Sequence, residues 1–449
     1  MTAVVDAAVG SPWRGRYART TVGVFALAFL FAFEALAVAT VMPDVAADLD
    51  GLSWYAVAFA APLAAGVVAL AASGVQVDRL GPAPVLRRGL LVFCAGVTVA
   101  GLAPTMPLFV LGRLVHGYGG GLIGVALYVV IAQAYPEAMR PRVFAVLTTA
   151  WVLPALVGPL LAAQVAELVG WRWVFLGVPA VAVAAWLLVA DAPSRPGPAA
   201  DRDARDRGRL RWALTERGVL AVSLGGQQVV AWWPLLVAVG LGAVVAGAGR
   251  VLPAGAWRLG AGLPAVIGSR AAIGTAFAAA EVYVPLLLVL ERGLSLAQAG
   301  WVLTTGAVTW STGAVLAARW RLLADQPGRV RAGALLLGSG ILGLATVSLP
   351  VVPLAVVVAA WGVAGLGIGM AFSTLSVLAL ATAAEGEAGR TSSSLQLADH
   401  LSNSVGVAVG GVVFAAFAES APAPAATGLV LAAGVVAFLA LVPAARLRD

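Results

Sequence analysis

The feature that most constrains this chain is a series of apolar runs, each about long enough to cross a bilayer as an α-helix. A helix of about 20 apolar residues spans the roughly 30 Å of hydrocarbon in a membrane. Six such runs precede a polar break and six follow it. They lie at about 21–43, 53–77, 86–105, 107–133, 143–168, 172–190, 271–290, 297–318, 332–349, 353–380, 391–417 and 425–443. The pattern predicts an all-α polytopic membrane protein.

Composition excludes the soluble alternatives. Hydrophobic residues make up 61% of the chain and charged residues only 11%, whereas a soluble domain carries about 25% charge. The basic residues are all arginine and fall in short clusters between apolar runs, so we expect no nucleic-acid partner. The sequence contains no recognisable Walker loop, Cys/His metal cluster or nucleophile elbow. We therefore expect neither an enzyme nor a cofactor or metal site.

The runs divide the chain into six parts. We expect a cytoplasmic tail at 1–19, an N-terminal six-helix bundle at 20–190, a cytoplasmic linker at 191–217, two short membrane helices at 218–249, a cytoplasmic connection at 250–270 and a C-terminal six-helix bundle at 271–445. The linker is rich in proline and then alternates Asp with Arg, which favours a solvated, flexible tether.

The segment 218–249 is the ambiguous part. It is apolar but interrupted, and two full crossings normally need about 40 residues. Both flanks, Arg217 and Arg250, are basic, so the number of crossings should be zero or two. We expect two short helices and fourteen spans; the alternative is a hairpin on the membrane surface and twelve spans.

Arginine placement predicts the orientation. With the N-terminus inside, 25 of the 28 basic residues fall on inner loops and tails, which the positive-inside rule associates with the cytoplasm. The outer loops hold only Arg172 and Arg292, and Arg113 lies within a span. We expect both termini in the cytoplasm. Exclusive use of arginine is typical of a GC-rich bacterial genome, so the expected location is the plasma membrane of a bacterial cell.

A weak internal repeat relates the two halves. The first and seventh main spans each carry one acidic residue, Glu34 and Glu281, followed by a proline. The next span of each half opens with a tryptophan, Trp54 or Trp301. Halves related by an axis along the membrane normal are a transporter architecture, with the substrate site at their interface.

Four motifs in the matching spans carry a resemblance to a known family. Residues 74–81 (GVQVDRLG), 111–117 (LGRLVHG), 158–159 (GP) and 34–43 (EALAVATVMP) are similar to motifs of the major facilitator superfamily, the last two to those of its drug:proton antiporters. The likeness covers essentially the whole chain. Two departures stand out: Pro82-Ala83-Pro84 precedes the basic pair at 87–88, and residues 154 and 162–163 lack the usual glycines.

This resemblance implies the major facilitator fold, with two pseudo-symmetric six-helix bundles, and an inner gate. In such a gate, Asp78 pairs with an arginine or a helix N-terminus of the other half. The residues assigned to gating are Gly74, Asp78, Arg79, Gly81, Gly158 and Pro159. Pro159 would also permit a bend in its span, because proline removes a backbone hydrogen bond.

Ionisable residues within spans are the main indication of function, because each costs about 2.5–3.5 kcal/mol at mid-helix. Counted from the ends of their spans, Glu34 and Arg113 lie at similar depth. We hypothesise that Glu34 carries the coupling proton and that Arg113 biases its pKa. The alternative is a static structural ion pair.

Two further groups are assigned to proton coupling. Glu281, near mid-membrane, would bind a second proton or a cationic substrate. Asp399 and His400 form a possible proton relay on a face shared with Gln396 and Asn403, because positions three, four and seven apart lie together on a helix. Interhelical hydrogen bonding is the alternative for this face.

Aromatic and polar side chains along the spans are assigned to a greasy substrate cavity, and packing in the core or against lipid is the alternative for some of the aromatics. They are Phe33, Tyr55, Phe59, His116, Tyr128, Tyr283, Trp361, Gln396 and Asn403. For His116 a packing donor is the alternative.

The reading with the most support is proton-coupled antiport that exports small amphipathic or cationic compounds by alternating access. The chain is expected to act as a monomer, with a small-molecule substrate, protons and the lipid bilayer as its partners. Alternatives are an exporter of a lipid or native metabolite, a membrane-embedded enzyme, and a scaffold without transport.

Overall fold

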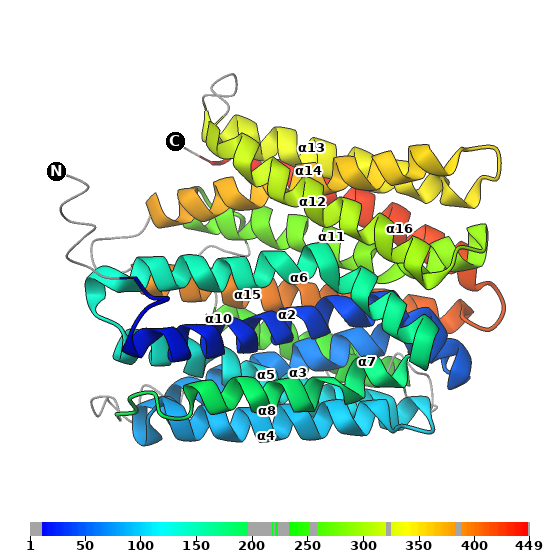
Figure 1. Cartoon of the computed structure of the whole chain (residues 1–449). Helices are drawn as coiled ribbons and strands as arrows, with labels where there is room; N and C mark the ends of the chain where they lie inside the picture. The colour runs from blue at the N-terminus through cyan, green and yellow to red at the C-terminus, as the bar shows by residue number, and fades with distance from the viewer. Residues whose placement is uncertain are drawn as a thin grey trace. The chain divides into compact units, whose positions relative to one another are not determined.

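The computed structural model describes residues 11–195, 218, 221–222, 233–251, 258–319, 325–381 and 388–447 (Figure 1). All regular structure in these residues is helical. Ten helices within them are long and apolar enough to cross a membrane. The expectation of an all-α polytopic protein is confirmed.

The chain divides into two compact units. Unit 1 comprises 1–38 and 65–209, and unit 2 comprises 39–64 and 210–449. The elements from the first part of the chain are α2 (Arg16–Asp48), η1 (Leu52–Trp54), α3 (Tyr55–Leu80), α4 (Pro82–Gly101), α5 (Met106–Ala134), η2 (Glu137–Met139), α6 (Arg140–Val169), α7 (Arg172–Leu176) and α8 (Val178–Val189). Those of the second part are α10 (Trp233–Val251), α11 (Leu263–Arg292), α12 (Leu296–Arg319), α13 (Gln326–Leu344), η4 (Ala345–Ser348), α14 (Leu354–Ala381), α15 (Ala388–Phe417), α16 (Pro422–Leu439) and α17 (Leu441–Ala444). The C-terminal end of α2 and the N-terminal part of α3 thus belong to unit 2.

In unit 1, α4 and α5 approach at backbone distance. A Cβ at Gly96 of α4 would overlap the backbone of His116, and one at Gly112 of α5 would lie 2.5 Å from the amide nitrogen of Ala100. Lipid offers no hydrophobic drive between helices, so close van der Waals packing through small residues holds them together. The glycines therefore set where the side chains of α5 lie.

Unit 2 repeats this pattern in the same order along the chain. Helices α13 and α14 meet at Gly333, where a Cβ would lie 2.7 Å from the carbonyl oxygen of Gly367. Helices α12 and α14 touch where Gly365 faces the carbonyl of Gly306. The equivalent contact in unit 1 joins α3 and α5. Matching contacts at matching positions support the internal repeat.

Proline and glycine delimit the helices as their backbone preferences require. Proline occupies the first turn of α4, α5, α6, α8, α11, α13 and α16, where its missing N–H costs nothing. Gly81 joins α3 to α4 with a φ of 80°, a conformation that side chains other than glycine rarely adopt. A Cβ at Gly81 would also lie 2.7 Å from the Ser194 hydroxyl.

The start of the predicted linker is tied to unit 1. The Asp191 carboxylate accepts an ion-pair contact of 2.9 Å from Arg19. The Gln133 amide donates to the carbonyl of Arg195 and accepts from its N–H, both at 2.8 Å. These contacts hold 191–195 across the ends of α2 and α5. The expectation of a flexible tether concerns mainly 196–217, which lies outside the described residues.

The segment 218–249 is described in part. Helix α10 occupies its second portion, and residues 218 and 221–222 are helical. A Cβ at Gly218 would lie 2.5 Å from the carbonyl oxygen of Gly240 on α10. This contact favours a pair of packed helices over a single one, and the number of crossings stays a prediction.

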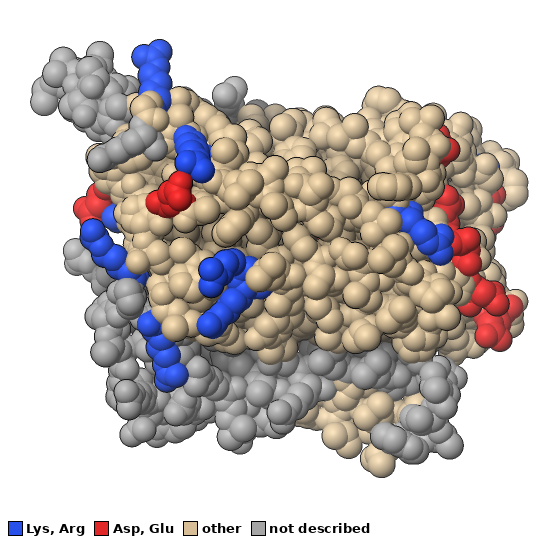
Figure 2. All heavy atoms as spheres, turned by 60° about the horizontal axis from the view of Figure 1, so that its bottom comes forward, with Lys and Arg blue, Asp and Glu red and all other residues tan. Residues whose placement is uncertain are grey.

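Charge is segregated along the helices. On the face drawn in Figure 2, most visible arginines gather toward one end and most visible acidic residues toward the other, with a band without charge between them. Arg79 and Arg87 flank the turn between α3 and α4. Asp48 and Asp50 lie at the other end of α3, where α2 ends and the chain turns back. A charge-free band flanked in this way matches the hydrocarbon of a membrane.

We predict that Gly96→Val destabilises unit 1. The added side chain would force α4 away from α5 at His116, and overpacking of this kind costs about 1–3 kcal/mol. Thermal unfolding of the purified protein in detergent measures the effect. Gly124→Ala on α5 is the control, because a Cβ there meets nothing within 4 Å. Equal unfolding midpoints for the two variants would show that the backbone contact is unimportant.

Candidate functional site

The most deeply buried charged cluster in unit 1 is centred on Glu34 of α2. One carboxylate oxygen, Oε1, pairs with the Arg113 guanidinium, and the other, Oε2, lies 2.7 Å from Nε2 of His116. Nδ1 of His116 is 3.4 Å from the same guanidinium. Relative exposures are 2% for Glu34 and 4% for each partner. Three ionisable groups therefore share one site closed to solvent, the Glu34 triad.

Local sequence explains how the triad is assembled. Arg113 and His116 are three residues apart on α5, so both side chains lie on one face. The His116 ring packs against Phe93 of α4 at a centroid distance of 4.8 Å, and Gly96 allows the two helices to approach this closely. Glu34 and Arg113, which the sequence places at similar depth, are thus in contact. His116, assigned to the substrate cavity, lies in the same buried cluster.

Burial makes the triad an electrostatic unit. Removing one partner of a buried ion pair leaves an uncompensated charge and typically costs about 3–5 kcal/mol. A proton that binds to Glu34 would also change its interactions with both partners.

A second ion pair lies in unit 2, between Arg270 of α11 and Asp399 of α15. Nε of Arg270 is 2.8 Å from each carboxylate oxygen. Its NH1 group donates to the hydroxyl of Ser376 at 2.6 Å, and the guanidinium lies 3.7 Å above the Phe372 ring. The pair joins α11, α14 and α15 within this unit.

Sequence reasoning missed Arg270. The hydropathy pattern predicts a span from 271, which places Arg270 in the connection 250–270. In the structure α11 begins at Leu263, so Arg270 lies within the helix. Gly262 precedes the helix and Pro264 lies in its first turn, a start signal that could have placed Arg270 inside the span. Asp399 thus has an arginine partner, and the relay through His400 stays a prediction.

The rest of the α15 face is partly described. His400 is partly exposed, and Asn403 points toward α11 at Gly274, where a Cβ would lie 3.1 Å from Oδ1 of Asn403. The side chain of Gln396 lies outside the described residues.

Glu281 of α11 contrasts with Glu34. It is partly exposed, and it has no ion pair or hydrogen bond with any other side chain that the structure describes. Beside it, the hydroxyl of Tyr55 donates to the carbonyl of Val282 at 3.1 Å, and the Tyr55 and Tyr283 rings stack at 6.2 Å. Both tyrosines also pack on Phe414. This contact joins the start of α3 to α11 and α15 inside unit 2.

The other residues assigned to a cavity differ in burial. Trp361 is 1% exposed and stacks on Phe277 at 5.0 Å, so it belongs to the packing of unit 2. Phe33 and Phe59 are partly exposed. Tyr128 is 47% exposed, with its ring 5.6 Å from Phe144. The assignment of Phe33, Phe59 and Tyr128 to a substrate cavity stays a prediction.

The residues assigned to gating lie in two places. Arg79 is exposed at the end of α3, Gly81 forms the turn, and a Cβ at Gly74 would meet no atom within 4 Å. The side chain of Asp78 lies outside the described residues. Gly158 and Pro159 are buried in α6.

Gly158 does not mark a tight contact. A Cβ there would lie 3.5 Å from the Phe33 ring, an ordinary van der Waals distance. At the described glycines of this unit, the closest backbone approaches between helices join α3, α4 and α5 instead.

Comparisons with known proteins agree on one family. The family model described as Major Facilitator Superfamily matches residues 24–407. A probable multidrug-efflux transporter of Mycobacterium tuberculosis is 28% identical, over 95% of this chain and 94% of the relative. The multidrug efflux pump SdrM of Staphylococcus aureus is 25% identical over 38% of each chain.

Solved structures show the same fold at low identity. An auto-inhibited POT family peptide transporter superposes with a TM-score of 0.70 at 16% identity, covering 94% of this chain and 96% of the other. A bacterial homologue of the lysosomal transporter Spinster gives 0.68 at 12% identity, covering 96% and 97%. At these identities the likeness concerns the fold alone.

We predict that Arg113→Met unfolds at a lower temperature than the wild type, because it leaves Glu34 charged and buried. The expected loss is about 3–5 kcal/mol. In the double variant Glu34→Gln/Arg113→Met the orphan charge is gone, so most of the loss should be recovered. Thermal unfolding in detergent measures both. Losses that simply add in the double variant would contradict the pairing.

Proposed function

Since the chain belongs to the major facilitator superfamily, we propose that it is a proton-coupled antiporter that exports small amphipathic or cationic compounds. The observation that carries the proposal is the Glu34 triad, in which a carboxylate on one membrane-spanning helix is buried against an arginine and a histidine of another. Ionisable groups kept inside hydrocarbon at such cost usually mark ion or substrate pathways. The names of the multidrug-efflux relatives support the substrate class.

In the proposed cycle Glu34 is the proton carrier. When its surroundings open to the outer side, a proton from water binds the carboxylate and weakens its attraction to Arg113. His116 then stays in contact with the neutral carboxyl group, while the released guanidinium charge is free to reorganise. On the inner side the proton leaves and the pair reforms. Glu34 is closed to solvent in this structure, so proton exchange requires a second conformation.

Glu281 is proposed as the acid that meets the substrate. It lacks a cationic partner among the described side chains and is partly exposed. A cationic compound could therefore supply the missing charge, and nearby aromatic rings could cover its apolar part. The Tyr55 contact to α11 beside it would have to break when this region opens outward.

We also propose the plasma membrane of a bacterial cell as the location, with both termini in the cytoplasm. The arginine-rich ends of the helices would face the cytoplasm, as the positive-inside rule requires. The organisms of the multidrug-efflux relatives are bacteria.

Transport in proteoliposomes with an imposed pH gradient tests the proposal. We predict gradient-driven movement of a cationic dye by the wild type. Glu34→Gln should reduce this dye movement to the level of protein-free vesicles, because an amide side chain cannot bind and release a proton. Glu281→Gln should lose cationic dyes while keeping any neutral substrate.

Glu291→Gln is the control, since Glu291 lies at the end of α11, away from mid-membrane. It should transport like the wild type. Full proton-driven efflux by Glu34→Gln would eliminate the coupling function of Glu34. A lack of dye movement by the wild type across a broad panel would favour export of a lipid or metabolite, or a role without transport.

A further inference from the structure

A pocket lies at the arginine-rich end of unit 1, away from the Glu34 triad. It has a volume of about 350 Å³ and is bounded by the end of α3, the start of α4, the ends of α5 and α8 and the segment after α8. Most of the residues that line it are apolar, among them Leu80, Leu86, Val130 and Val189. The proposed proton cycle does not use this space, although Leu80 of the 74–81 motif lines it.

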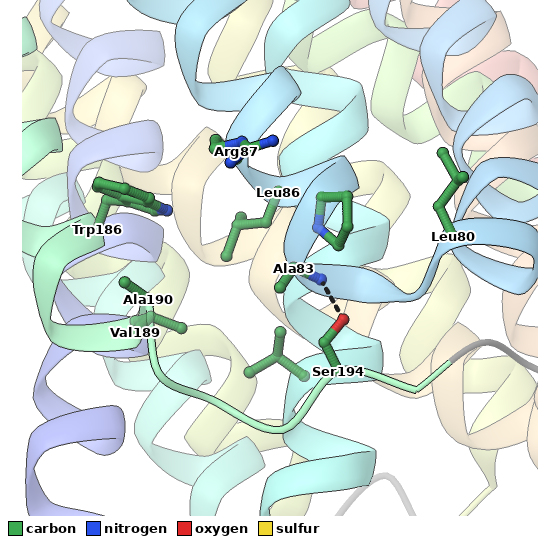
Figure 3. Close-up of a pocket in the computed structure, with 10 residues that line it drawn as sticks. Leu80, Ala83, Leu86, Arg87, Trp186, Val189, Ala190 and Ser194 are labelled. Atoms are coloured by element: carbon green, nitrogen blue, oxygen red, sulfur yellow. Dashed lines mark hydrogen bonds between the residues drawn. The ribbon is translucent and has the colours of Figure 1, made fainter.

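Three polar side chains line the pocket: Arg87, Trp186 and Ser194. Figure 3 shows Arg87 and Trp186 on α4 and α8, and Ser194 beside the first turn of α4. The Ser194 hydroxyl oxygen accepts a hydrogen bond of 3.0 Å from the Ala83 N–H, which leaves its own proton to donate elsewhere. Among the described residues that line the pocket, none is acidic. The polar groups therefore present donors and positive charge.

The helices that frame the pocket face lipid there. Leu91, one turn beyond Arg87 on the same face of α4, is 65% exposed, and Leu187, next to Trp186, is 51% exposed. Large apolar side chains left exposed on membrane helices contact acyl chains. Arg87 lies about one turn inside the start of α4, at the depth where arginine and tryptophan meet headgroups.

We propose that this pocket binds the headgroup of an anionic phospholipid from the leaflet on the arginine-rich side. The Arg87 guanidinium and the indole N–H of Trp186 would bind the phosphate. The Ser194 hydroxyl, which lies beyond Leu86 in Figure 3, would contact another polar part of the headgroup. The apolar walls would cover the glycerol and first acyl carbons. Basic pockets between membrane helices on the cytoplasmic side have this preference. A free phosphate would leave the apolar walls uncovered.

Binding would connect two parts of the chain. The headgroup would touch α4 directly after the Gly81 turn and also Ser194, next to Arg195, which Gln133 holds. An anionic lipid would therefore stabilise the attachment of residues 191–195 to unit 1.

Native mass spectrometry of the purified full-length protein tests the proposal. Wild type is incubated with phosphatidylglycerol or, separately, with phosphatidylcholine, and retained lipid is counted. We expect preferential retention of phosphatidylglycerol, reduced about 5-fold in Arg87→Gln, as loss of one membrane-surface cation implies. Trp186→Leu should also retain less.

Arg88→Gln is the matched control, because it removes the same charge from the adjacent exposed residue, which does not line the pocket. It should retain phosphatidylglycerol like the wild type. Equal losses in both arginine variants would reduce the effect to diffuse surface charge and overturn the site. Equal retention of phosphatidylcholine, or displacement of the lipid by millimolar glycerol phosphate, would overturn the anionic-lipid assignment.

Discussion

The ion pair between Glu34 and Arg113 constrains the rest of unit 1. Each charge would cost about 2.5–3.5 kcal/mol alone at mid-membrane, and their pairing offsets part of that cost. His116 completes the site because it follows Arg113 by one helical turn and is held by Phe93. The glycine contact between α4 and α5 at Gly96 brings these residues together. Helix packing and the buried charge are thus parts of one arrangement.

The two units share their helix contacts but differ in their charges. Small residues join equivalent helices in both, which is expected when lipid replaces water as the solvent. Unit 2 nevertheless places its ion pair between Arg270 and Asp399 and leaves Glu281 without a described partner. The two units therefore differ at their ionisable positions. The proposed division between a proton site and a substrate site follows from this difference.

Hydropathy predicted the class, the main spans and the depth of Glu34 and Arg113, because membrane thickness determines helix length and therefore depth. It could not predict helix rotation, which decides which side chains meet. Trp361 was assigned to a cavity but packs on Phe277, and Asp399 pairs with Arg270. The attachment of residues 191–195 was also missed, because its hydrogen bonds use backbone groups and Gln133, which leave no hydropathy signal.

Infrared difference spectroscopy of the purified protein between acidic and alkaline pH tests most directly whether Glu34 exchanges a proton. We expect the wild type to show a protonated-carboxyl band at acidic pH, Glu34→Gln to lose part of this band, and Glu291→Gln to keep that part. A carboxyl band that Glu34→Gln leaves unchanged would show that Glu34 is a static partner of Arg113, and would contradict the proposed coupling.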